Sequence, residues 1–154
     1  MMMSLCCDII KRLQGRTLVT AESCTGGGIG AALTAVPGSS KVYKGGIISY
    51  TNEVKIHQLG VNAETLNREG AVSADVAEEM ALGARKVLNA DVAVSVTGLA
   101  GPDGDEFGNP VGTVFIGYSD KDTTISRKFL FSGNRDDVRK QAMQAALELI
   151  LEFR

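Results

Sequence analysis

A serine and a glycine-rich turn are the residues of this sequence best suited to chemistry. Ser23 closely follows a short apolar stretch that begins at Thr17, and three glycines at 26–28 separate it from a helical segment of small residues. A strand, a tight turn and a helix in that order place the turn at the carboxyl end of the strand, where open α/β sheets bind ligands. Glycine allows close backbone approach, and free N–H groups at a helix start favour an anion. Ser23 is therefore the first candidate nucleophile.

The same pattern is also compatible with purely structural roles. A serine before a helix commonly caps it, and glycines there can serve close helix packing. The turn matches neither the GxSxG elbow of α/β-hydrolases nor the GxxxxGK[ST] phosphate loop. The local pattern leaves the nucleophile and the helix cap both open.

The other reactive side chains offer few alternatives. Cys24 could be a rival nucleophile, but its thiolate would need His57, the only histidine, as a partner. We expect His57 to be a solvated helix residue instead. Asp103 and Asp105 resemble part of a metal-binding loop, yet no EF-hand spacing follows. We predict no metal site and no cofactor.

Hydrophobic periodicity and turn residues predict the elements that must position these side chains. Helices are expected over residues 4 to about 14, 29–36, 52–60, 62–68, 73–88 and 134–153. Strands are expected over 17–20, 42–51, 91–97, 111–119 and 124–131, the last two as an antiparallel hairpin. This order predicts an α/β fold: a three-layer α/β/α sandwich on a mixed, mostly parallel sheet of about five strands.

Size and composition predict one domain, 1–154, of a cytoplasmic protein. The net charge of -2 carries no electrostatic signature of nucleic-acid binding, and the apolar runs are far too short to span a membrane. No signal-peptide core follows the initial methionines. Three cysteines, two of them adjacent and none in a CxxC pair, argue against disulfides and zinc and for a reducing compartment.

Five blocks of the sequence resemble the carboxyl-terminal domain of the CinA (competence/damage-inducible) family. In order they are TAESCTGGGIG, PGSSKVYKGGIISYTNEVKIHQLGV, GAVSADVAEEMA, SVTGLAGPDG with NPVGTVFIGY, and NRDDVRKQA, and they span residues 4–152. The resemblance implies an α/β/α fold and, as in stand-alone members, hydrolysis of nicotinamide mononucleotide to nicotinic acid mononucleotide and ammonia in pyridine nucleotide salvage. It implies a Ser-Lys pair on Ser23 and Lys55. Nothing in the chain corresponds to the pyrophosphatase-type domain of larger members.

Lys55 could accept a proton only as a neutral amine. Asn52 is the expected helix cap, which puts Lys55 at the third helical position, where the dipole lowers a lysine pKa by about 0.2 to 1.5 units. Bringing the pKa from about 10.4 to near 7 needs about 4.6 kcal/mol, so burial among Ile48, Tyr50 and the glycine turn must supply the rest. We expect a desolvated amine about 2.6–3.2 Å from Ser23 Oγ. A surface lysine is the alternative.

Substrate contacts are expected around the same crevice. Backbone N–H groups of Cys24, Thr25, Gly26 and Gly27 would stabilise an oxyanion, although the turn could hold a phosphate instead. Arg135 follows the predicted cap Asn134, where a cation is unfavourable, so it needs a partner: Asp136, Asp137 or a nucleotide phosphate. Further candidates, for some of which a turn or cap role is equally open, are Ser39, Ser40, Tyr50, Asn52, Thr97, Gly98 and Gly101.

Two functions from different classes remain open at this stage. The first is an amidohydrolase acting on a small-molecule nucleotide substrate, without nucleic-acid or membrane partners, in a homo-oligomer. The second is a catalytically weak nucleotide-binding or partner-binding module of the same family. The presence of both Ser23 and Lys55 favours the enzyme, because a binding module has no need for an unprotonated lysine.

Overall fold

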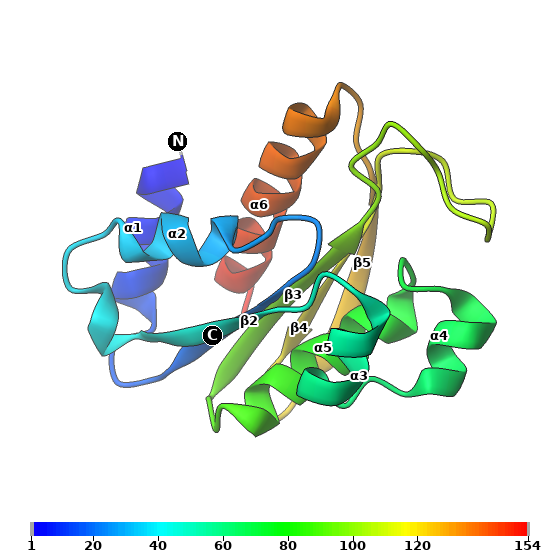
Figure 1. Ribbon diagram of the computed structural model, residues 1–154. Coiled ribbons are helices and arrows are strands. Elements are labelled where there is room, and N and C mark those ends of the chain that lie inside the picture. Colours follow the sequence, from blue (N-terminus) through cyan, green and yellow to red (C-terminus); the bar gives the residue numbers. More distant parts are fainter. Residues whose placement is uncertain (1, 154) are drawn as a thin grey trace.

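The computed structural model describes residues 2–153, and its strands form one five-stranded sheet in the order β2-β1-β3-β4-β5 (Figure 1). Strands β2, β1 and β3 are parallel, β4 is antiparallel to β3, and β5 is antiparallel to β4. The predicted mixed sheet and its terminal hairpin are confirmed. The strands are β1 (Leu18–Glu22), β2 (Tyr43–Ile48), β3 (Val92–Gly98), β4 (Thr113–Ser119) and β5 (Thr124–Leu130).

Helices cover both faces of the sheet, which confirms the α/β/α sandwich (Figure 1). One face carries α1 (Met2–Arg12), α2 (Gly28–Thr34) and α6 (Arg135–Leu151), and the other carries α3 (Asn52–Leu59), α4 (Ala63–Glu69) and α5 (Ala74–Val87). Each face has its own apolar core, because alternate strand residues such as Leu18 and Val19 point to opposite sides. No helix among residues 2–153 is long and apolar enough to cross a membrane.

The central strands are buried on both faces, which explains their continuous apolar runs. The polar side chains within them bond to neighbouring elements. Ser95 Oγ donates to the Ala77 carbonyl at 2.6 Å, and Thr97 Oγ1 donates to the Ala71 carbonyl at 2.8 Å. Helix α5 and the segment that precedes it therefore supply the acceptors that these hydroxyl groups of β3 require.

The helix caps differ from prediction at one functionally important place. Thr51, not Asn52, caps α3, since its hydroxyl accepts the Val54 N–H at 3.3 Å. Lys55 is thus the fourth helical residue rather than the third. The predicted starts of the two long helices are confirmed: Ser73 caps α5, and Asn134 forms a reciprocal capping box with Asp137 at the start of α6.

Three chain segments meet at the carboxyl edge of the parallel strands. Glu22 at the end of β1 lies beside Ile48 of β2 and Val96 of β3. The Ser23 N–H donates to the Val96 carbonyl at 3.1 Å, and the Ser49 N–H donates to the Glu22 carbonyl at 2.7 Å. Residues that leave these three strands are therefore brought to one point although they are far apart in sequence.

Candidate active site

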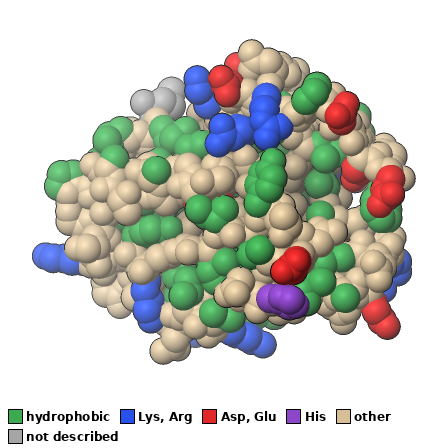
Figure 2. All heavy atoms as spheres, viewed as in Figure 1, with side chains coloured by type: hydrophobic (Ala, Val, Ile, Leu, Met, Phe, Trp, Pro, Cys, Tyr) green, Lys and Arg blue, Asp and Glu red, His purple; other side chains and the backbone are tan. Residues whose placement is uncertain are grey.

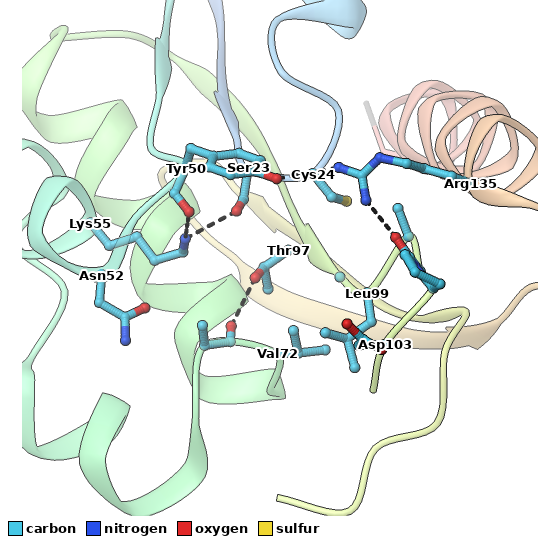
Figure 3. Close-up of a pocket in the computed structure, with 15 residues that line it drawn as sticks. Ser23, Cys24, Tyr50, Asn52, Lys55, Val72, Thr97, Leu99, Asp103 and Arg135 are labelled. Carbon is cyan, nitrogen blue, oxygen red and sulfur yellow. Dashed lines mark hydrogen bonds between the residues drawn. The ribbon is translucent and has the colours of Figure 1, made fainter. Parts of the chain in front are cut away.

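A cavity of about 430 Å³ opens where the parallel strands end (Figure 3). The turn after β1, the first turn of α3, the segment before α5, the loop after β3 and the first residue of α6 enclose it. The residues that line it are Ser23, Cys24, Tyr50, Asn52, Lys55, Ala71, Val72, Thr97, Gly98, Leu99, Ala100, Gly101, Pro102, Asp103 and Arg135.

The Lys55 amine lies against the Ser23 hydroxyl, with 3.0 Å between Nζ and Oγ (Figure 3). Two backbone carbonyls also accept from Nζ: Ser49 O at 2.7 Å and Tyr50 O at 3.4 Å. Only 1% of Lys55 and 7% of Ser23 is exposed. The interpretation of Lys55 as a surface residue is therefore wrong.

Burial lowers the pKa of Lys55 to about 8. At pH 7 about a tenth of the molecules then carries a neutral amine. Such an amine can donate its two N–H groups to the carbonyls of Ser49 and Tyr50 while its lone pair accepts the Ser23 O–H. The two carbonyls thus hold the amine in an orientation suited to take a proton from Ser23.

Ser23 does not cap the helix that follows it. The cap position of α2 is Gly27, which has no side-chain capping bond. The carboxylate of Glu22 supplies the missing acceptors, because it accepts the N–H groups of Ile29 at 2.9 Å and Gly30 at 3.0 Å. The helix-cap interpretation of Ser23 is wrong, and its hydroxyl remains at the cavity.

Cys24 is a poor alternative nucleophile in this environment. Burial raises the pKa of its thiol to about 11, so the thiol stays protonated at neutral pH. His57 is exposed on α3, as expected, and is visible on the surface in Figure 2. The structure therefore favours Ser23 over a Cys-His pair.

The turn after Ser23 has three N–H groups without backbone acceptors among residues 2–153, those of Cys24, Thr25 and Gly27. The Ser23 carbonyl is held by the Gly26 N–H at 3.1 Å. Because a trans peptide sets its C=O and N–H in opposite directions, this bond aims the Cys24 N–H away from Gly26. The prediction that Gly26 serves an oxyanion is wrong, since its N–H is occupied within the turn.

Gly27 is also a predicted oxyanion donor. It lines a separate cavity of about 240 Å³ together with Tyr43 and Ile48, not the cavity that holds Ser23. The chain adopts a φ of 98° there to enter α2, a left-handed conformation that favours glycine. Cys24 lines the cavity that holds Ser23 and Thr25 does not, and we keep these two residues, the nearest to Ser23 in the turn, as the predicted oxyanion donors.

Arg135 faces the cavity instead of its neighbouring acids. Its guanidinium donates to the Gly101 carbonyl at 2.6 Å and to the Tyr50 hydroxyl at 3.3 Å. Asp137 is occupied by the capping box, and no carboxylate among residues 2–153 forms an ion pair with Arg135. The interpretation of Arg135 as the ion-pair partner of Asp136 or Asp137 is wrong, and its charge remains available to a ligand.

The other predicted contact residues divide into two groups. Tyr50, Asn52, Thr97, Gly98 and Gly101 line the cavity. Ser39 and Ser40 do not, because they form a short 3₁₀ turn before β2, at the amino end of that strand. The parallel sheet puts that end opposite the site, so the prediction that they contact substrate is wrong for the cavity of their own chain.

Sequence reasoning missed three residues that support the site. Glu22 caps α2, the Ser49 carbonyl binds the Lys55 amine, and Arg139 of α6 donates to the carbonyls of Cys24 at 3.0 Å and Thr25 at 3.3 Å. A carboxylate at the end of an apolar strand was a signal for Glu22. Nothing local indicated the other two, because a backbone carbonyl and a helix 114 residues from Thr25 in sequence are joined to the site only by folding.

Comparison with known proteins identifies one family. The family model described as CinA C-terminal domain matches residues 3–153. A CinA-like protein of Thermosynechococcus vestitus is 52% identical over 147 residues, which cover 92% of this chain and 35% of that protein. The chain spans about a third of the length of the first curated relatives it matches.

Other relatives are matched over most of their length. The nicotinamide-nucleotide amidohydrolase PncC of Escherichia coli K12 is 46% identical over 140 residues, covering 90% of this chain and 85% of that protein. The crystal structure of a CinA superfamily protein from Escherichia coli has a TM-score of 0.96 at 36% identity, covering 99% of this chain and 90% of that chain. The crystal structure of CihA from Agrobacterium tumefaciens has a TM-score of 0.94 at 38% identity, covering 98% of this chain and 94% of that chain. These structures confirm the α/β fold.

Replacing the buried lysine is expected to stabilise the protein. A pKa of about 8 in the folded state, against 10.5 without burial, means that the folded state binds fewer protons than the unfolded state between these values. Burial of Lys55 thus costs about 3 kcal/mol below pH 8, and this cost disappears as pH rises toward 10.5. Lys55→Met should raise the free energy of unfolding at pH 7 by about 1–3 kcal/mol, less at pH 10.

Urea denaturation at both pH values measures this difference. Lys41→Met, at an exposed position, is the matched control and should leave the free energy of unfolding nearly unchanged. A loss of stability in Lys55→Met at pH 7 would contradict the lowered pKa.

Proposed function

Because the chain belongs to the CinA C-terminal domain family, we propose that it is an amidohydrolase that converts nicotinamide mononucleotide to nicotinic acid mononucleotide and ammonia. The observation that carries this proposal is the buried Lys55 amine 3.0 Å from Ser23 Oγ in a cavity large enough for a mononucleotide. The name of the Escherichia coli relative, of which 85% is covered, supports the substrate. The reaction belongs to pyridine nucleotide salvage.

The proposed reaction has two stages that use the same pair. Ser23 Oγ attacks the carboxamide carbon while Lys55 takes the hydroxyl proton, and the N–H groups of Cys24 and Thr25 stabilise the oxyanion. As the intermediate collapses, Lys55 returns the proton to the leaving nitrogen, which departs as ammonia and leaves an ester on Ser23. Water then attacks the ester with Lys55 again as base, which releases the carboxylate product and restores the hydroxyl.

The far end of the cavity suits the phosphate of the substrate. Arg135 offers a guanidinium without an ion-pair partner among residues 2–153, held in place by Gly101 and Tyr50. This position leaves the glycine turn free for the oxyanion, since the two negative charges of the transition state then lie at different ends. Asn52, at the start of α3, would contact the pyridine or ribose between them, and Thr97, Gly98 and Gly101 line the same cavity.

Ammonia release from nicotinamide mononucleotide by the purified protein tests the proposal. We expect Ser23→Ala and Lys55→Arg each to lower kcat by at least about 10³-fold, because each removes a member of the pair. Lys41→Arg is the matched control for the lysine and should keep full turnover. Absence of release by the wild-type protein would instead favour a nucleotide-binding module, and release unchanged in Ser23→Ala would discard the nucleophile.

The pH dependence of kcat/KM should report the Lys55 amine. The base must be neutral, so kcat/KM should fall about tenfold per pH unit as pH drops below about 8 and level off above it. The profile is measured above pH 6.5, where the substrate phosphate is already largely a dianion, its second pKa being about 6. A flat profile between pH 6.5 and 9 is incompatible with Lys55 as base.

We infer in addition that the protein is a cytoplasmic homo-oligomer. The outer edge of β2 is unpaired among residues 2–153, and Ile48 and Tyr50 are 56% and 60% exposed beside it. Figure 2 shows hydrophobic side chains gathered on the face that β2 crosses in Figure 1. Sedimentation of the purified protein should give a mass above 16.2 kDa; a monomer at micromolar concentration would contradict this inference.

A further inference from the structure

The carboxylate of Glu22 lies at the centre of a buried network directly beside the nucleophile in sequence. Glu22 is 2% exposed, and both of its oxygens are bonded. One oxygen accepts the Thr25 hydroxyl at 2.7 Å and the Ile29 N–H at 2.9 Å, and the other accepts the Gly30 N–H at 3.0 Å. A single side chain therefore joins the end of β1, the nucleophile turn and the start of α2.

Helix α2 depends on this side chain for its N-terminal hydrogen bonds. It has only seven residues, and its cap residue Gly27 supplies no side-chain acceptor. Short helices are marginal on their own, and their first N–H groups need acceptors. The Glu22 carboxylate provides these acceptors and places a negative charge at the positive end of the helix.

The same bonds close the turn that contains Ser23. The Glu22 backbone is fixed by its pairing with Ile48 and Val96, while its side chain fixes Thr25 and α2. Ser23 thus lies between two anchored points. On the other side of the turn, Arg139 donates to the carbonyls of Cys24 and Thr25.

Close packing leaves this carboxylate little freedom to move. A β-carbon at Gly30 would come within 2.6 Å of the Tyr43 hydroxyl, which is too close, and would lie in van der Waals contact with the Glu22 carboxylate at 3.6 Å. The Tyr43 hydroxyl is itself bonded to Thr20 Oγ1 at 2.7 Å. Glu22 does not line the cavity that holds Ser23, so it would act only through the turn.

We infer that Glu22 is a positioning residue: its bonds to Thr25 and α2 hold Ser23 Oγ in line with the Lys55 amine and aim the N–H groups of Cys24 and Thr25. This inference rests on the proposed function. A displacement of about 1 Å at a reacting group can cost about 10²-fold in rate, so the bonds that prevent it affect turnover rather than binding.

Glu22→Gln tests this role with almost no change in size. An amide has one acceptor oxygen, so its NH₂ group must face an N–H or O–H that now lacks an acceptor. We expect kcat to fall about 10²-fold with KM within about twofold, because the substrate contacts of Arg135 and Asn52 are untouched. The rate at which a fluorophosphonate labels Ser23 should fall similarly. Assays are run well below the melting temperature of the variant.

Asp91→Asn is the matched control. Asp91 also accepts a backbone N–H and a threonine hydroxyl, both from Thr17, but it lies at the opposite end of the sheet. The Asp91→Asn variant should be somewhat less stable than the wild-type protein and keep the wild-type kcat. If Glu22→Gln fails to fold, Thr25→Val tests the role of Glu22 instead. This variant removes only the 2.7 Å hydrogen bond from the Thr25 hydroxyl to Glu22, and it should lower kcat and the rate of Ser23 labelling by about tenfold.

The outcomes separate this inference from the proposed function. If Glu22→Gln retains both kcat and labelling within about threefold, or raises KM alone, Glu22 does not position Ser23. If the wild-type protein is labelled at Ser23 but releases no ammonia, the substrate assignment fails while the labelling rates still decide the role of Glu22. If the wild-type protein is not labelled at Ser23 and releases no ammonia, both the role of Glu22 and the proposed function are overturned, since there is then no reactive serine to position.

Discussion

The contact between a buried amine and a serine hydroxyl organises this protein. The amine of Lys55, a residue that is 1% exposed, loses its hydration, and among residues 2–153 only the Ser49 and Tyr50 carbonyls and the Ser23 hydroxyl replace it. The loss lowers the pKa of Lys55 to about 8, the direction that a base requires. The folded state carries this cost, and the packing of two large apolar cores must offset it.

The sheet topology makes the contact possible. Because β1, β2 and β3 are parallel, the residues that follow them leave the sheet at one edge, and each supplies a different part of the site. The chain after β1 brings Ser23 and its N–H groups, the chain after β2 brings the carbonyls and then α3 with Lys55, and the chain after β3 forms a wall. Helix α6 reaches the same edge with Arg135 and Arg139, one toward the cavity and one toward the turn.

The glycines of the turn and the charge at the start of α2 have separate roles. Gly26 and Gly27 take positive φ values of 59° and 98° and carry the chain sharply from β1 into α2. The negative charge at the helix start comes from within the chain, as the Glu22 carboxylate, so that end of α2 is already occupied. This favours Arg135 as the phosphate contact in the proposed reaction and leaves Cys24 and Thr25 for the oxyanion.

The order of helices and strands, the fold class and the two residues of the proposed pair follow from the sequence by itself, because periodicity, capping residues and motif blocks are local patterns. The resemblance to the CinA C-terminal domain, now supported by a family model over residues 3–153, also depends only on sequence. Tertiary structure alone decided which acceptors hold Lys55, that Glu22 rather than Ser23 caps α2, and that Ser39 and Ser40 lie at the far end of β2. Each of these depends on contacts between segments distant in sequence, or on the direction of a strand, and no local pattern encodes either.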